Sequence, residues 1–223
     1  APKAPWATPW PYKKLNKKTE SIENPKYIIY DFESDTHTGI HQPNHVEIDI
    51  LKISDDHDYN KSLKHTLSFT GYDVCDQFCT WLFSKENANS TVIAHNQAGY
   101  DGKFILQWCL TKGLQPQKYI RQGSRIMYMS FIKYGLRFVD SLHFFLQPLK
   151  GLSDTYGIDA IKGFFPHHFN RPENQQYIGN IPEEDQYGSI NMNKEDYNGN
   201  DKDSTDPEYK EGFKRLYDKQ ILN

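Results

Sequence analysis

The sequence has 223 residues, 14% of them aromatic, and a formal net charge of −3. A chain of this length can bury one sizeable core or two small ones, and its 15 Tyr and 13 Phe exclude a generally disordered protein. The slight negative charge gives no overall attraction to nucleic acid, so any such contact must come from local patches.

The sequence also indicates whether the chain could span a membrane and whether its cysteines form disulfides. No apolar run approaches the roughly 20 residues of a membrane span, and the amino terminus lacks the apolar core of a signal peptide. The three cysteines, with Cys75 and Cys79 four apart, match neither a disulfide framework nor a zinc pattern. We therefore expect no membrane partner and an intracellular protein with reduced core cysteines, in the nucleus, the cytoplasm or the mitochondrion.

Residues 1–24 carry four prolines and five lysines. This composition is typical of a flexible, basic, Pro-rich linker, although the lysines between residues 13 and 18 would also suit DNA contact or a targeting signal. We favour the linker interpretation.

The first strongly patterned stretch runs from Tyr27 to Glu33. Its aromatic and β-branched residues favour a buried strand, and Pro25 precludes an earlier helix. Alternate side chains share one face of a strand, so Asp31 and Glu33 point the same way and Phe32 points to the other face. Adjacent carboxylates raise each other's pKa unless a cation lies between them, which predicts a divalent metal bound by oxygen ligands.

Two more strands and a helix are expected next. An alternating apolar run at residues 46–53 predicts a strand after a turn at residues 39–44, and a third strand is expected near residues 66–70. Apolar residues then recur at helical spacing, which predicts an amphipathic helix over residues 72–84.

The stretch AHNQAGYDGKFI at residues 94–105 supplies a second polar cluster. Residues 91–95 predict a buried strand whose end delivers His95 and Asn96. Asp101 lies where the next helix would begin, and Gly113 would end that helix. A third carboxylate beside two hydrogen-bonding side chains suggests a carboxylate cluster for metal-assisted phosphodiester chemistry.

The remaining elements complete an α/β (α+β) pattern. Residues 125–131 and 136–140 predict a pair of hairpin strands, and residues 149–156 predict a short helix. The acidic stretch at residues 183–208 is expected to form an exposed, mobile insertion, and helical periodicity returns at residues 208–222.

Several of these stretches together resemble a known family. Asp31-Phe32-Glu33 resembles the first exonuclease motif of family-B DNA polymerases, and His95 to Asp101 resembles the second. Three further segments are similar to the protein-primed branch of bacteriophage, linear-plasmid and Polinton/Maverick-type transposon polymerases: DSLHFF at 140–145, IKGFF at 161–165 and FPHHFN at 165–170. The resemblance extends from about residue 26 to about 222 and implies a viral or transposon origin.

The resemblance implies an RNase H-like 3′→5′ exonuclease fold, a mixed sheet flanked by helices, over residues 25–180. Residues 181–223 would then be an acidic loop and a terminal helix that lead to a missing remainder. In this family two divalent metal ions, Mg²⁺ or Mn²⁺, are held by carboxylates from three motifs and activate a water that attacks the terminal phosphodiester.

The resemblance also assigns roles to particular residues. By resemblance, Asp31, Glu33 and Asp101 are catalytic residues that bind the metal ions. Lys162 is the fourth catalytic residue, and its positive charge stabilises the transition-state phosphate. The positions that correspond to contacts with a single-stranded 3′ end, where an aromatic ring can stack on a base, are His95, Asn96, Tyr100, Phe104, Ser141 and Leu142.

Simpler interpretations exist for the same residues. They are a solvated acidic edge at Asp31 and Glu33, helix caps at Asn96 and Asp101, core aromatics at Tyr100 and Phe104, a turn at Ser141 and a surface lysine at Lys162.

The sequence departs from the family at its end, because Asn223 precedes the place of the third motif, Tyr-x-x-x-Asp. Tyr197 to Asp201 is a formal match, but Gly and Asn between them disfavour a helix. The palm carboxylates of the polymerase are also absent.

We therefore expect the exonuclease portion of a protein-primed DNA polymerase. Its partners would be a single-stranded DNA 3′ end, the rest of the polymerase and a terminal priming protein. The alternatives are a non-catalytic remnant that retains single-stranded DNA binding, and a stand-alone nuclease whose last carboxylate is Asp201, Asp203 or Asp206.

Overall fold

The computed structural model describes residues 26–53, 63–157, 165–175, 177 and 182–187. Within these residues the strands are β1 (Lys26–Asp35), β2 (Gln42–Lys52), β3 (Leu63–Thr70), β4 (Ser90–Ala94), β5 (Lys118–Gln122), β6 (Arg125–Phe131) and β7 (Leu136–Asp140). The α-helices are α1 (Val74–Leu82), α2 (Asp101–Thr111) and α3 (Leu149–Tyr156). Short 3₁₀ helices are η2 (Lys85–Asn87), η3 (Ile132–Tyr134), η4 (Ser141–His143), η5 (Pro172–Asn174) and η6 (Glu184–Tyr187).

All seven strands form one mixed sheet in the order β3-β2-β1-β4-β7-β6-β5. β1, β4 and β7 run parallel to one another, and the other neighbours are antiparallel. The parallel trio matters for function, because the carboxyl ends of β4 and β7 come together at one edge of the sheet. The α/β class and the mixed sheet flanked by helices are as predicted.

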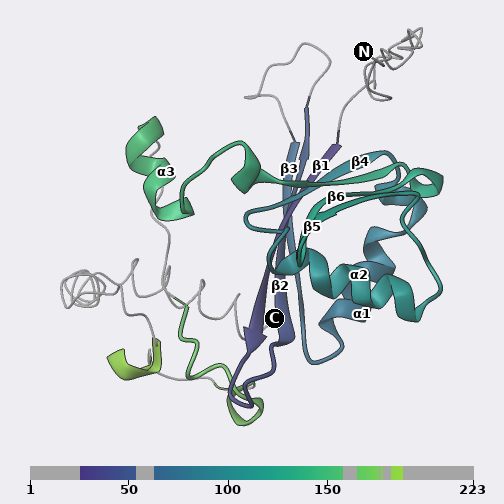
Figure 1. Ribbon diagram of the computed structural model, residues 1–223. Coiled ribbons are helices and arrows are strands. Elements are labelled where there is room, and N and C mark those ends of the chain that lie inside the picture. The colour runs from purple at the N-terminus through teal and green to yellow at the C-terminus, as the bar shows by residue number, and fades with distance from the viewer. Residues whose placement is uncertain (1–25, 54–62, 158–164, 176, 178–181, 188–223) are drawn as a thin grey trace, which may run out of the picture.

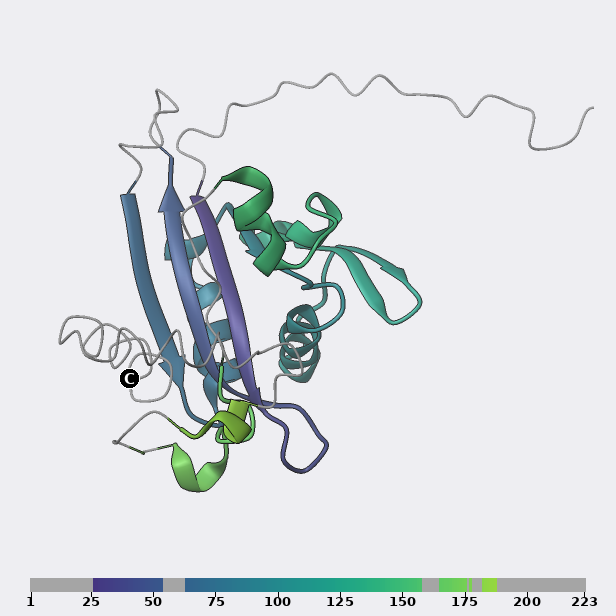
Figure 2. The same ribbon diagram turned by 90° about the vertical axis from the view of Figure 1, so that its left-hand side faces the viewer.

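The two faces of the sheet differ in character. On β1, Ile28, Tyr30 and Phe32 are buried, whereas Ile29 and Asp31 are exposed. Helices α1 and α2 cover the buried face, and α3 lies on the opposite side of the sheet (Figures 1 and 2). The alternation predicted for residues 27–33 is therefore confirmed, with Phe32 on the core side and Asp31 on the other.

Aromatic side chains fill the space between β1 and the helices. The Phe78 ring of α1 stacks on Tyr30 at 5.2 Å between centroids and meets Phe32 edge-on at 5.4 Å. Phe104 of α2 also meets Phe32 edge-on, at 5.7 Å. Each buried aromatic contributes on the order of 1.5–3 kcal/mol, so both helices are fixed against the strand that carries Asp31.

Most predicted elements are present, and one strand was missed. The predicted strands at 46–53, 66–70, 91–95, 125–131 and 136–140 correspond to β2, β3, β4, β6 and β7, and the helices at 72–84, 101–112 and 149–156 to α1, α2 and α3. β5 was missed because all five of its residues are exposed and it pairs only with β6, so no apolar alternation marks it.

The FPHHFN segment is attached to the sheet by a pair of amide side chains. Asn44 Nδ2 donates to Asn170 Oδ1 at 2.7 Å, and Asn170 Nδ2 donates back to Asn44 Oδ1 at 3.1 Å. Both residues are buried. This segment therefore lies at the end of β1 and β2 near their connecting turn (Figure 1).

The described residues also include the three cysteines and part of the acidic stretch. Cys75, Cys79 and Cys109 are free thiols, and the last two are buried. None of the described helices is long and apolar enough to cross a membrane. The basic linker, Lys162, the terminal helix and all but the first few residues of the acidic stretch lie outside the described residues.

Candidate functional site

The predicted carboxylates come from β1 and from the start of α2, which lies beside β1. Asp31 and Glu33 lie on β1, and Asp101 is the first residue of α2. Asp101 is only 2% exposed, and its Oδ1 accepts a hydrogen bond from the backbone N–H of Phe32 at 3.1 Å. This bond joins the two motifs, because Phe32 lies between Asp31 and Glu33.

Burial and charge perturb Asp101 strongly. Burial, followed by the negative charge of Asp31, raises the pKa of Asp101 to about 7. The hydrogen bond from Phe32 opposes this rise in pKa. A carboxyl held near its titration midpoint at neutral pH lacks a compensating positive charge, and this is the environment that a bound cation would relieve.

Burial and three carboxylates act on the pKa of the Tyr100 phenol. Burial raises it first, and the charges of Asp101, Glu33 and Asp31 raise it further. The donor chemistry therefore suits a hard divalent cation. In the part of the chain that the structure describes, however, no group of three or more His, Cys, Asp or Glu side chains is already arranged to hold a metal ion.

The buried carboxylate of Asp140, at the end of β7, organises the neighbouring loops. Its Oδ1 accepts from the backbone N–H of Asn96 and of Leu142, both at 2.9 Å, and its Oδ2 accepts from Ala98 N–H at 2.8 Å. The loop that follows β4 and the segment that follows β7 are thus bound to the same side chain. Both segments carry predicted substrate contacts.

The loop of residues 95–100 has a backbone conformation that requires this support. Asn96 adopts a left-handed conformation with φ of +68°, which is uncommon for residues other than glycine. Gln97 is buried and accepts a hydrogen bond from Tyr30 Oη at 3.0 Å. A Cβ at Gly102 would lie 2.9 Å from the Gln97 carbonyl oxygen, so glycine is needed there.

His95 and Ser141 are brought together by the parallel strands β4 and β7. His95 Nε2 lies 3.1 Å from the Gln147 carbonyl oxygen, which can only accept, so Nε2 carries the proton. His95 Nδ1 lies 3.0 Å from the Ser141 hydroxyl oxygen, and this hydroxyl also lies 3.4 Å from the Ala94 carbonyl oxygen. Ser141 also begins η4, so the turn interpretation of this residue is correct alongside its contact with His95.

The aromatic rings of Tyr100 and Phe104 pack against each other beside the carboxylates. Tyr100 meets Phe104 edge-on at 5.1 Å, and its hydroxyl lies 2.9 Å from His41 Nδ1. Phe104 is half-buried against Phe32, so it belongs partly to the core. Tyr100 is half-buried as well.

A small cavity lies on the face of the sheet that carries Asp31. Its volume is about 250 Å³, and α3 and the segment after β7 form its other walls. The polar side chains in its lining are Asp31, Glu47, Asp49, His95 and Ser141. Asp31 and Glu47 are register partners on β1 and β2, so carboxylates from both strands face this cavity.

The structure corrects one alternative interpretation of a predicted site residue and shows contacts of further residues that were not predicted. Asn96 does not cap α2, because the residue before the helix is Tyr100 and no side chain caps it. Asp101 does more than begin the helix, since it bonds to β1. Sequence reasoning missed the role of Asp140, the contact between His41 and Tyr100, and the β2 carboxylates Glu47 and Asp49. Of these, only Asp140 could have been noticed in the sequence, because it ends an apolar strand. The predicted roles of the site residues stay predictions.

Comparisons with known proteins identify relatives of this chain. The model of a family described as DNA polymerase type B, organellar and viral, matches residues 83–221. Among solved structures, Phi29 DNA polymerase complexed with single-stranded DNA has a TM-score of 0.50 at 18% identity, covering 66% of this chain and 26% of that one. Its ternary complex with primer-template DNA and nucleotides has a TM-score of 0.47 at 17% identity, covering 78% and 28%.

The chain thus spans about a quarter of the length of the polymerase that it matches. At this level of identity the likeness concerns the fold alone, and it agrees with the predicted α/β class with a mixed sheet flanked by helices. No protein with a curated description matches the sequence.

Asp140→Asn tests the hydrogen bonds that organise the loops. The amide keeps the shape of the carboxyl but replaces one acceptor oxygen with a donor, so at least one buried N–H loses its partner. We expect the free energy of unfolding, measured with urea, to fall by about 1–3 kcal/mol. Asp154→Asn, at an exposed position on α3, is the control and should change little. Equal losses in the two variants would contradict the role of Asp140.

The pKa of Asp101 predicts a pH dependence of stability. The folded protein holds this proton more tightly than the unfolded chain, where the pKa is near 3.8. The free energy of unfolding should therefore fall as pH rises from about 4 to about 7, by on the order of 4 kcal/mol. Urea unfolding at pH 5 and pH 8 in a chelator should show about 2.6 kcal/mol of this fall for the wild type and a much smaller change for Asp101→Asn. Identical pH profiles would exclude Asp101 as its source.

Proposed function

Because the chain belongs to the organellar and viral family of type B DNA polymerases, we propose that it provides the 3′→5′ exonuclease module of a protein-primed DNA polymerase. The module would remove nucleotides from a single-stranded 3′ end during DNA replication. Its remaining partners would be the rest of the polymerase and a terminal priming protein, inside the cell.

One observation carries this proposal. The hydrogen bond from Phe32 N–H to Asp101 holds a third carboxylate against a strand that already presents two. A buried carboxylate whose pKa is raised by burial and by a neighbouring carboxylate, as for Asp101, is costly to stability unless it serves a cation. A cluster of this kind, next to side chains that suit a nucleic-acid end, supports metal-assisted hydrolysis of a phosphodiester.

Asp31, Glu33 and Asp101 are the residues that would hold Mg²⁺ or Mn²⁺. When bound, two such ions supply an activated water and neutralise charge on the leaving 3′ oxygen. Asp101 must lose its proton to become a ligand, and the Phe32 N–H stabilises the charged form that results. Glu33, on the same strand face as Asp31, would orient the water. Lys162 would add a positive charge near the phosphate.

The 3′ end would lie between the loop of residues 95–100 and the segment after β7. The half-buried Tyr100 ring would contact a base or sugar, and burial and nearby carboxylates raise the pKa of its phenol. The His95–Ser141 pair faces the cavity that contains Asp31. Asn96, Phe104 and Leu142 complete the predicted set of contacts.

A second candidate function is supported by a separate observation. Because no three-residue metal group is preformed in the described residues, binding of single-stranded DNA without hydrolysis is the alternative. In that case the loops held by Asp140 would still bind a strand, and the carboxylates would not catalyse.

Mg²⁺-dependent shortening of a 5′-labelled single-stranded DNA distinguishes the two functions. We expect the purified chain of residues 1–223 to shorten the DNA from its 3′ end. Asp31→Ala/Glu33→Ala should be slower by at least roughly a thousandfold, which corresponds to about 4 kcal/mol of transition-state stabilisation. Glu86→Ala/Asp154→Ala, which removes two exposed carboxylates, is the matched control.

Two outcomes of this experiment would contradict the proposed hydrolysis by these carboxylates. Folded wild-type chain that binds the DNA without shortening it would contradict hydrolysis and favour the binding function. Shortening that survives in Asp31→Ala/Glu33→Ala would show that these carboxylates are not the catalytic ones.

A further inference from the structure

Positive charge is concentrated in one stretch of the sequence. Between residues 102 and 139 there is no Asp or Glu, although the whole chain has a formal net charge of −3. The seven basic residues of this stretch are Lys103, Lys112, Lys118, Arg121, Arg125, Lys133 and Arg137. The stretch folds into α2 and the strands β5, β6 and β7.

Four of these residues lie on α2 and on the β5–β6 hairpin. Lys103, Lys118, Arg121 and Arg125 are all exposed, and within the described residues none of them forms an ion pair with a carboxylate. Lys112, by contrast, is paired with Asp76 at 2.8 Å. The four therefore form an uncompensated basic surface, which attracts polyanions.

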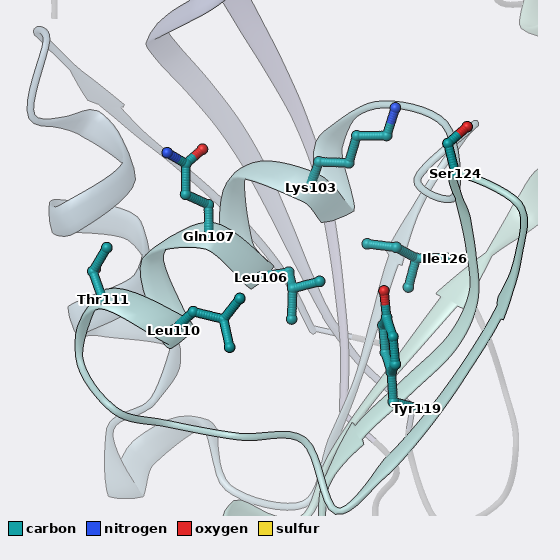
Figure 3. A pocket seen from close by; sticks show the side chains of 8 residues that line it. All are labelled: Lys103, Leu106, Gln107, Leu110, Thr111, Tyr119, Ser124 and Ile126. Carbon is teal, nitrogen blue, oxygen red and sulfur yellow. The ribbon is translucent and has the colours of Figure 1, made fainter.

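An apolar groove of about 520 Å³ separates α2 from the hairpin. Leu106 and Leu110 point into it from the helix, and Tyr119 and Ile126 face them from the strands, with Lys103 at the rim (Figure 3). Tyr119 is 41% exposed and Leu110 is 56% exposed. These side chains leave apolar and aromatic surface accessible beside the basic residues.

The hairpin is connected to the loop of residues 95–100. Ile126 N–H donates to the Ala98 carbonyl oxygen at 2.9 Å, and Arg125 Nη2 donates to Asn96 Oδ1 at 3.5 Å. Arg121 is the register partner of Ile126, so it lies on the face of the hairpin that borders the groove. The basic surface thus begins beside Asn96 and continues along the groove.

We propose that α2 and the β5–β6 hairpin bind a single strand of nucleic acid at a site separate from the carboxylates. A base lies in the groove against Tyr119, and phosphates contact Lys103, Arg121 and Arg125. Basic side chains beside an aromatic surface are what a single strand requires, because its phosphates need cations and its bases need a stacking surface. An acidic protein partner would need the charges alone and would leave the groove unused. This inference rests on the proposed function only for the source of the strand, namely the segment upstream of the 3′ end.

Fluorescence anisotropy of a labelled oligothymidine, in EDTA to prevent hydrolysis, tests the phosphate contacts. Arg121→Gln/Arg125→Gln should bind roughly tenfold more weakly at low salt. The slope of log affinity against log salt should fall by about 1.4, or 0.7 for each phosphate contact. Lys52→Gln/Lys85→Gln removes the same charge from exposed positions outside the groove and should bind like the wild type. Equal weakening in both double variants would overturn the site, since it would show a general charge effect.

Tyr119→Leu tests the groove itself. We expect roughly tenfold weaker binding with an unchanged salt slope, because stacking is lost and the charges remain. An unchanged affinity would exclude a base in the groove. Poly-glutamate that competes as well as the unlabelled oligonucleotide would instead indicate an acidic protein partner and overturn the proposal. Because binding is read without metal, loss of nuclease activity and loss of this site give different results.

Discussion

The carboxylate of Asp140 holds together the two chain segments that surround the site. β4 and β7 are parallel neighbours, so their carboxyl ends meet at one edge of the sheet, and Asp140 binds three backbone N–H groups there. Without these bonds, buried N–H groups of the loop after β4 would lack acceptors, which is costly. The left-handed Asn96 and the position of Asp101 both depend on that loop.

Charge is divided between two sides of this loop. Asp31, Glu47 and Asp49 face the cavity beneath α3, whereas the charged side chains of the β5–β6 hairpin and of the exposed surface of α2 are all basic. A nucleic-acid strand favours the basic side, and a cation favours the acidic side. The loop between them carries Asn96 and Tyr100, so a strand bound along the hairpin would lead its end toward the carboxylates.

The sequence predicted the parts of this arrangement that local patterns encode. Alternation around Phe32 placed Asp31 and Glu33 on one face, and helical spacing after Asp101 placed that residue at a helix start. The β5 strand escaped prediction because its exposed residues lack periodicity. The Asp140 bonds, the Glu47 neighbour of Asp31 and the His41–Tyr100 contact escaped because they depend on strand order and register, which sequence spacing does not reveal.

Isothermal titration calorimetry with Mg²⁺ and Mn²⁺ near pH 7 tests most directly whether Asp31, Glu33 and Asp101 form a metal site. Titration in two buffers of different ionisation enthalpy counts the protons released. Because the pKa of Asp101 is about 7, binding should release a fraction of a proton from the wild type and be strongly weakened in Asp101→Asn. Absence of binding to the folded chain, or equal binding by Asp101→Asn, would contradict a metal site built on these carboxylates.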